Sequence, residues 1–339
     1  MKPKITDGTK TVDVSSSTKP KIADVAKVAG VSPTTVSRVL NNRGYIGEKT
    51  RIKVQQAMEQ LNYFPNDIAR SLFIKKTYLI GIIFPTTSNP FYGQLIFHLE
   101  NISASLGYKT LLCNSQGRED KEKNYLKMLQ RNQVDGIIAG AHNRRIEEYD
   151  IPSLPVVGID RYLSETIPVV SSDNYDGGKQ ATQLLVNKGC KHIIHINGPI
   201  SLETPANLRR RAYEDTMREN HLPYLTYEVD GNDQEIIEKL FDENPQVDGV
   251  FASDDIIASR VIREAKKRKI DIPSNLKVIG YDGTETTRLL LPELSTIQQP
   301  IKEIAEKTIE ILLKQISGEN DDVHPETVLP VTLIESETT

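Results

Sequence analysis

At 339 residues and 38.0 kDa the chain exceeds the usual size of one hydrophobic core, which predicts a small domain joined to a large or divided one. No stretch approaches the roughly 18 apolar residues of a membrane span, and residues 1–19 lack the apolar core of a secretion signal, so we expect a disordered leader on a cytoplasmic protein. The net charge of -4 divides unevenly along the chain. Residues 1–19 contribute +2, residues 20–80 contribute +6 from ten Lys/Arg against four Asp/Glu, and residues 81–339 therefore carry -12. This distribution is typical of a nucleic-acid-binding segment that precedes an acidic body, which repels phosphate.

The first predicted helix ends at a glycine. Ile22, Val25, Ala26 and Ala29 recur at helical spacing, and Gly30 follows where a left-handed cap is favourable. The stripe therefore predicts a short amphipathic helix that stops at Gly30.

A second short helix follows directly. Ser32 is expected as its N-cap and Pro33 as its first residue, while Val36, Val39 and Leu40 face inward. Two helices around a tight turn are typical of a helix-turn-helix, whose second helix reads the major groove. The outward positions of that helix are polar side chains able to bond base edges or phosphates, namely Thr34, Thr35, Ser37, Arg38, Asn41 and Asn42.

A third helix completes the front of the chain, and a short fourth helix follows it. The inward stripe of the third helix is Val54, Ala57, Met58 and Leu61, with Lys49, Arg51 and Lys53 near its start. A short helix capped by Asn66 and closed by Lys75 and Lys76 comes next; it is too short to be stable unless it folds on a partner.

The stretches IADVAKVAGVSPTTVSRVLNN and NYFPNDIARSL resemble the head and hinge of the lactose-repressor (LacI/GalR) family of transcription regulators. The resemblance implies that hinge helices of two subunits pair in the minor groove, where a leucine, here Leu72, wedges between base steps. The DNA-binding residues expected on these grounds are Ser32, Pro33, Thr34, Thr35, Ser37, Arg38, Asn41, Asn66 and Leu72.

Beyond residue 77, short β-rich runs alternate with helical stretches in the rhythm of parallel, doubly wound α/β sheets. About ten strands are expected, which favours two lobes with a cleft between them. Polar residues such as Asn89, Asp160 and Asp282 gather just past the predicted strand ends, where open α/β sheets bind ligands.

The body also resembles the family's two-lobed, periplasmic-binding-protein-like core. The predicted fold is therefore an all-α head (20–64), a hinge helix and linker (65–76) and a doubly wound α/β core for effector binding and dimerisation (77–339). At residues 253–255 the chain has Ser-Asp-Asp where some members have an asparagine. The resemblance, together with the preference of sugars for carboxylate, amide, guanidinium and aromatic groups, implies these effector-binding residues: Asn89, Phe91, Asp160, Arg161, Arg209, Asp254, Asp282 and Gln299.

Motifs such as SNPFYG, DRYL and GYDGT look closest to the sucrose-operon repressors of the family. A homodimeric repressor on a palindromic operator, controlled by sucrose, fructose or a related sugar phosphate, is the function implied. Arg161 and Arg209 would be the donors to a phosphate. A family member that regulates carbon catabolism globally and answers to a phosphorylated carrier protein is the alternative.

Two other classes of protein are less consistent with the sequence. No nucleotide-binding, hydrolase or zinc-protease motif occurs, so neither catalysis nor a cofactor or metal is expected. Asp254 and Asp255 resemble an acid/base pair only superficially, because one of them is expected to cap a helix. A sugar-transport protein would carry an export signal and lack the basic head. Cys113 and Cys190 are expected as buried thiols.

Overall fold

The computed structural model describes residues 19–65, 76–141, 143, 146–149, 154–202, 204–319 and 324–339, and it divides the chain into two compact units between Thr77 and Tyr78. The expected leader, the hinge helix, Asn66 and Leu72 lie outside the described residues, so their roles stay predictions. None of the described helices is long and apolar enough to cross a bilayer.

The first unit contains the three predicted helices of the head, α1 (Ile22–Ala29), α2 (Pro33–Leu40) and α3 (Glu48–Gln60). Gly30 ends α1 in the left-handed conformation (φ 65°), and the Ser32 side chain caps α2 by accepting from Thr35 N, as predicted. A small core holds the helices together; its buried side chains are Val25, Ala26, Ala29, Val36, Val54 and Ala57.

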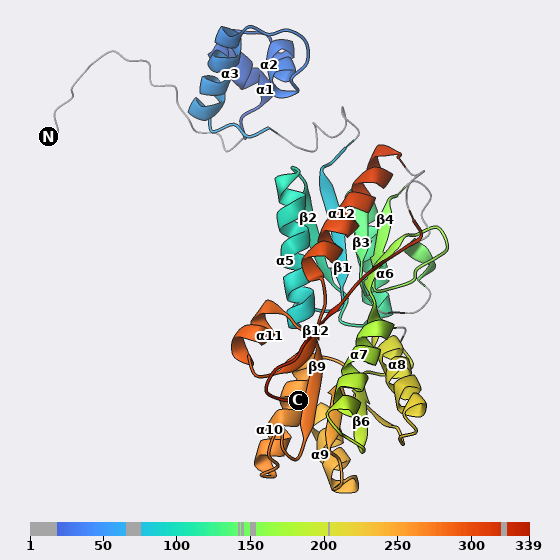
Figure 1. Cartoon of the computed structure of the whole chain (residues 1–339). Coiled ribbons are helices and arrows are strands. Elements are labelled where there is room, and N and C mark those ends of the chain that lie inside the picture. The colour runs from blue at the N-terminus through green and yellow to red at the C-terminus, as the bar shows by residue number, and fades with distance from the viewer. Residues whose placement is uncertain are drawn as a thin grey trace, which may run out of the picture. The chain divides into compact units, whose positions relative to one another are not determined.

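The second unit consists of two lobes, each built on a six-stranded sheet (Figure 1). Lobe 1 has the strand order β11-β5-β4-β3-β1-β2, and all of its strands are parallel. Its strands are β1 (Leu79–Phe84), β2 (Lys109–Asn114), β3 (Gly136–Ala139), β4 (Val156–Ile159), β5 (Val169–Ser172) and β11 (Glu326–Leu329). Its helices are α5 (Pro90–Ser105), α6 (Glu119–Arg131), α12 (Ile301–Ser317) and the 3-10 turn η1 (Glu147–Tyr149).

Lobe 2 repeats this plan with the order β12-β10-β9-β8-β6-β7, in which only β12 is antiparallel to its neighbour. Its strands are β6 (Ile193–Asn197), β7 (Leu225–Glu228), β8 (Gly249–Ala252), β9 (Lys277–Asp282), β10 (Ser295–Gln298) and β12 (Thr332–Ile334). Its helices are α7 (Asn174–Asn187), α8 (Ala206–Glu219), α9 (Asp233–Glu243), α10 (Asp255–Lys267) and α11 (Glu285–Leu290).

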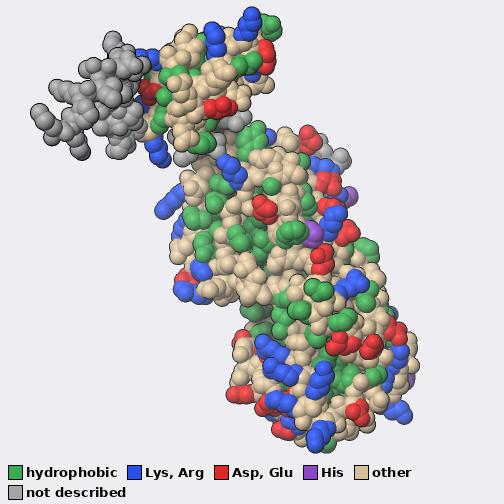
Figure 2. All heavy atoms as spheres, turned by 90° about the vertical axis from the view of Figure 1, so that its left-hand side faces the viewer, with side chains coloured by type: hydrophobic (Ala, Val, Ile, Leu, Met, Phe, Trp, Pro, Cys, Tyr) green, Lys and Arg blue, Asp and Glu red, His purple; other side chains and the backbone are tan. Residues whose placement is uncertain are grey.

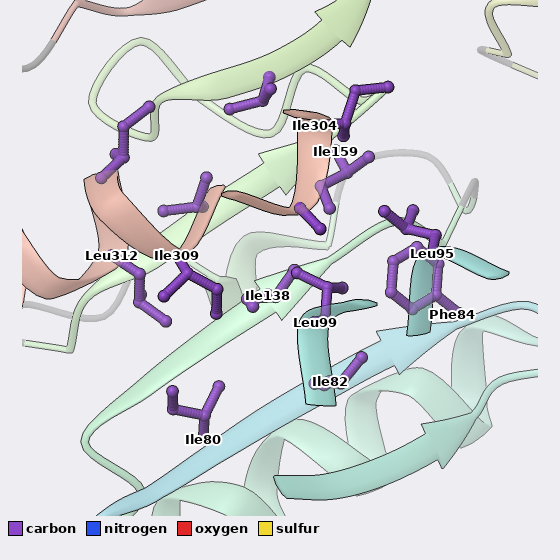
Figure 3. Packing of buried hydrophobic residues seen from close by; sticks show 14 of the residues in the cluster. Ile80, Ile82, Phe84, Leu95, Leu99, Ile138, Ile159, Ile304, Ile309 and Leu312 are labelled. Atoms are coloured by element: carbon purple, nitrogen blue, oxygen red, sulfur yellow. The ribbon is translucent and has the colours of Figure 1, made fainter. Parts of the chain in front are cut away.

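The strands of lobe 1 are apolar on both faces because helices cover both sides of the sheet. Ile82 lies in the cluster that α5 and α12 cover, whereas its neighbour Ile83 packs with Leu126 and Leu129 of α6. Figure 3 shows the first cluster, in which Leu95 and Leu99 of α5 and Ile309 and Leu312 of α12 meet the strand residues. The doubly wound core predicted from the β-rich runs is thus confirmed, with twelve strands among the described residues in place of about ten.

The chain passes between the lobes three times, after β5, after β10 and between β11 and β12. In each sheet the strand order reverses beside the first strand of the lobe, β1 or β6. The carboxyl ends of the strands at such a reversal form a crevice, which is where doubly wound sheets bind ligands. The ligand site is therefore expected between the two lobes.

Candidate functional site

The exposed face of α2 carries the polar side chains that were predicted to read DNA. Thr34 and Arg38 are exposed, and Thr35, Ser37 and Asn41 are half-buried beside them. A hollow in this face is lined by Thr34, Ser37, Arg38, Asn41, Arg43 and Gly44. Because Val36 is fully buried on the opposite side, the helix can offer this polar row to a groove without losing its core contact.

The loop after α2 adds residues that the sequence pattern did not single out. Arg43 lines the same hollow, and the Tyr45 side chain is fully exposed. Arg51, near the start of α3, binds within the head: Nη2 donates to Asn42 Oδ1 (2.9 Å) and Nε to Ile46 O (3.3 Å). Arg51 therefore braces the loop that presents Arg43 and Tyr45.

A cavity of about 380 Å³, the cleft cavity, lies between the two lobes and falls within the usual size range of small-molecule sites. Its walls hold Asn89, Phe91, Tyr92, Asp160, Gly198, Thr204, Pro205, Ala206, Arg209, Val229, Asp233, Ser253, Asp254, Ile256, Ile257, Arg260, Asp282 and Gln299. Seven of the eight predicted effector residues are in this wall, and Arg161 is not.

Arg209 of α8 is the central cation of the cleft cavity. Its Nε donates to Asn174 Oδ1 (2.8 Å) and its Nη1 to Ser253 O (2.6 Å), and Nη1 lies 3.7 Å from Asp282 Oδ1. The guanidinium also stacks on the Tyr281 ring, 3.6 Å from its centroid. A planar group held on several sides is preorganised for bidentate hydrogen bonding to a ligand.

Asp282 and Gln299 connect the cavity to the segments that join the lobes. Gln299, between β10 and α12, donates from Nε2 to Asp282 Oδ1 (2.7 Å). Its Oε1 accepts from Ser172 Oγ (2.6 Å) at the end of β5. Two of the three connections are thus bonded to each other directly beside the Asp282 carboxylate, which lines the cleft cavity.

Burial raises the pKa values of the carboxyl groups around the cavity. The pKa of Asp160 rises to about 6, partly offset by Arg209, and burial likewise raises the pKa of Asp254 and, strongly, that of Asp282. Asp160 and Asp282 also have positive φ angles of 53° and 106°. Unusual backbone angles at two aspartates that line one cavity are typical of a binding site that the surrounding structure holds in place.

Asp254 and Asp255 do not form an acid/base pair. Asp254 caps α10 by accepting from Ile257 N (2.8 Å), as expected for one of the two. Asp255 turns away and accepts from Gly283 N (2.9 Å) and Thr296 Oγ1 (2.6 Å). Asp255 therefore supports the turn after Asp282, and Asp254 is the one that faces the cavity.

Arg161 has a different position from the one predicted. Its Nη1 donates to Glu122 Oε1 (2.7 Å), its guanidinium also binds the carbonyls of Ala141 and Asn143, and both charged side chains are buried inside lobe 1. The sequence places Arg161 next to Asp160, but the left-handed backbone at Asp160 (φ 53°) turns the chain, and the two side chains have different surroundings. Arg161 thus anchors the loop that carries Asp160 and is not a donor to ligand in the cleft cavity.

The remaining wall residues were missed by the sequence analysis. Asp233 and Arg260 form an ion pair in the wall of the cavity, and Tyr92 adds a second aromatic ring beside Phe91. Of these residues, only Tyr92 could have been found from the sequence, because the motif SNPFYG places it next to the predicted effector residue Phe91. Asp233 and Arg260 lie on two separate helices, and no local pattern relates them.

Replacing Asp160 by asparagine is expected to change how stability depends on pH. The wild-type carboxyl binds its proton more tightly when folded, so its contribution to stability is full below about pH 4 and is lost as the pH rises through about 6. The Asp160→Asn variant avoids burying that charge and should be more stable than wild type by about 1–3 kcal/mol at pH 7.5. Urea unfolding at pH 4, 5, 6 and 7.5 measures the difference in the free energy of unfolding between the variant and wild type. If the variant is as much more stable at pH 4 as at pH 7.5, the raised pKa of Asp160 is wrong.

Comparisons with known proteins match both units. A family model described as bacterial regulatory proteins, lacI family, matches residues 21–66, and a periplasmic binding protein-like domain matches residues 182–339. A sucrose operon repressor from Streptococcus mutans serotype c is 45% identical over 303 residues, which are 89% of this chain and 94% of that protein.

Two solved structures extend the likeness. A periplasmic binding protein/LacI transcriptional regulator from Alkaliphilus metalliredigens, complexed with D-xylulofuranose, is 36% identical with a TM-score of 0.71 over 77% of this chain and 99% of that one. The Lac repressor dimer bound to operator and the anti-inducer ONPF has a TM-score of 0.84 at 24% identity, over 95% of this chain and 99% of that one, and so shares the fold.

Proposed function

This chain belongs to the LacI family of bacterial regulatory proteins, and on that premise we propose that it represses a sucrose-utilisation operon and releases or tightens its operator in response to a sugar. It is a DNA-binding repressor of the sugar-operon class. The observation that carries the proposal is the presence, in one chain, of a polar face on α2 and a cavity lined by charged, amide and aromatic side chains between two lobes.

The residues around the cleft cavity support a sugar as the effector. Carboxylates and amides accept and donate to neighbouring hydroxyls, a guanidinium binds two of them at once, and Phe91 and Tyr92 offer aromatic faces. Of the described cations in the wall, Arg209 lies beside Asp282 and Arg260 is paired with Asp233. With Arg161 bonded elsewhere, the described wall favours an uncharged sugar over a sugar phosphate.

A homodimer in the cytoplasm is part of the proposal. One helix-turn-helix reads a half-site, so two copies on a palindromic operator are needed for tight binding. Large apolar side chains are exposed on α5 and α11, namely Phe97 (63% exposed), Leu289 (80%) and Leu290 (71%). Both helices lie at the left of Figure 1, on the side that faces the viewer in Figure 2, where hydrophobic side chains gather over the upper lobe. We assign the dimer contact to this side.

Control by the sugar follows from the connections between the lobes. A sugar that binds Asp282 and Gln299 contacts the bonded pair of connecting segments, so it prefers one relative position of the lobes over another. A change in that position in both subunits alters the spacing of the segments leading to the heads and hence the pairing of the two Leu72 wedges.

Operator binding in the presence of sugars tests the proposal. Fluorescence anisotropy at physiological salt should show tight binding to a palindromic duplex and weak binding to a random one. Sucrose or a component sugar should change the operator affinity severalfold or more. Equal affinity for both duplexes would refute DNA reading, and a response only to a phosphorylated carrier protein would favour the global regulator.

A further inference from the structure

A second cavity, the side cavity, adjoins the cleft cavity between the lobes. It has a volume of about 510 Å³ and is lined by Asp160, Arg161, Tyr162, Val169, Ser171, Asn174, Thr204, Pro205, Asn207, Leu208, Pro325 and Glu326. Asp160, Thr204 and Pro205 belong to the walls of both cavities, so these residues form the partition between two adjacent spaces. A ligand made of two linked units can place one unit on each side of this partition.

Two polar atoms in this shared wall have no hydrogen-bond partner. Asp160 Oδ1 and Thr204 Oγ1 are both buried, and neither has a partner among the described residues. Buried polar atoms are nearly always bonded in folded proteins, because each unbonded one costs free energy. A sugar hydroxyl that enters the partition between the two cavities satisfies both atoms, since it donates to a carboxylate and accepts from a threonine hydroxyl. The Asp160 carboxyl as a whole is also held by Asn174 and Ser172, which leaves Oδ1 as its unbonded oxygen.

The wall of the side cavity contains more apolar surface than the wall of the cleft cavity. Tyr162 is 64% exposed and Leu208 47% exposed, and Pro325 lines the cavity with them. The cleft cavity, by contrast, has four carboxylates and two guanidiniums in its wall. An exposed tyrosine ring in a cavity suits the apolar face of a pyranose or furanose ring, which stacks on aromatic side chains.

We propose that the effector has two sugar rings, one bound in the cleft cavity and the other in the side cavity against Tyr162, with a hydroxyl between them bonded to Asp160 and Thr204. This inference rests on the proposed function, because it assumes that the cleft cavity binds the regulatory sugar. It adds that recognition discriminates disaccharides from their component monosaccharides.

Binding of one-ring and two-ring sugars to full-length variants tests the proposal by calorimetry. The two-ring probes are sucrose and sucrose 6-phosphate; the one-ring probes are glucose, fructose and their 6-phosphates. Tyr162→Ala should weaken the two-ring probes about tenfold, the loss expected for one aromatic contact. The same change should leave the one-ring affinities within about twofold, since those sugars are held by the cleft cavity alone.

The matched control is Tyr224→Ala, because Tyr224 is also an exposed tyrosine (45%) of the second unit and lines neither cavity. It should leave both groups of affinities unchanged. A Thr204→Val variant, which removes only the hydroxyl function, should weaken the two-ring probes as Tyr162→Ala does. Urea unfolding measured on each preparation shows that the mutated unit is folded.

Several results would contradict the proposal that a second sugar ring binds in the side cavity. They are an unchanged two-ring affinity in Tyr162→Ala, an equal loss for both groups of sugars, or wild-type protein that binds two-ring sugars no more tightly than one-ring sugars. If Arg209→Ala still abolishes sugar binding in these cases, the cleft cavity remains the effector site and only the second ring's place is wrong. If no probe binds wild type, the sugar effector itself is refuted as well.

Discussion

Arg209→Ala should abolish the response of operator binding to sugar and weaken sugar affinity by about 100-fold or more. The change removes the guanidinium that bonds Asn174 and Ser253 and lies beside Asp282, so the cavity loses its main donor to ligand hydroxyls. Truncation of a buried, hydrogen-bonded charge typically costs 2–5 kcal/mol or more, of which about 1.4 kcal/mol corresponds to a factor of ten. Calorimetry with sugar and anisotropy with operator measure the two effects separately.

The control lies on the same helix. Arg211 is two residues away on α8, and its side chain is 73% exposed and outside the cleft cavity, so Arg211→Ala should respond to sugar like wild type. Operator affinity without sugar should be the same in both variants, because the head forms a separate compact unit. A normal sugar response in Arg209→Ala would remove this residue from the site.

Arg38→Ala is expected to have the largest effect on DNA binding. Arg38 is exposed on the reading face of α2, where a guanidinium can bond guanine O6 and N7 together. Each such pair contributes about 1–3 kcal/mol of discrimination, and a dimer on a palindrome makes two. Affinity for the operator should therefore fall by about 100-fold or more, while affinity for random duplex falls much less.

A conservative variant separates base reading from charge. Arg38→Lys keeps the positive charge but loses the planar pair of donors. If Arg38 reads a base, the lysine variant should still lose most of the preference for operator over random duplex. If Arg38→Lys keeps the full wild-type preference for operator, the residue contacts only phosphate. Lys27 is an exposed cation on α1, so Lys27→Ala is the control for loss of one positive charge from the head.

The head could be predicted almost completely because its signals are local. The helix stripes, the Ser32 cap and Gly30 each act within a few residues, and every one appears in the structure. The strand-end position of Asp160 and Asp282 was equally readable, since the C-terminal ends of parallel strands define where ligands bind. Arg209 came from resemblance to the family and not from spacing.

The errors involve partners that are distant in sequence. Arg161 was expected to face the same cavity as Asp160, but Glu122, 39 residues earlier, binds its guanidinium, and Arg161 lines the side cavity and not the cleft cavity. Likewise, nothing in the run VLPVTLI shows that β11 extends the sheet of lobe 1 and β12 that of lobe 2. Such pairings depend on the packing of the whole unit.

The triple passage of the chain between the lobes has a consequence for synthesis on the ribosome. The strands β1 to β5 emerge first, yet the face formed by Ile80, Ile82 and Phe84 is covered only in part, by α5, until α12, over 120 residues beyond β5, is translated. Lobe 2 in turn lacks its edge strand β12 until residues 332–334 are made. Both lobes are therefore completed only by the last residues of the chain, so the nascent chain exposes apolar surface until late in synthesis, the condition under which chaperones act.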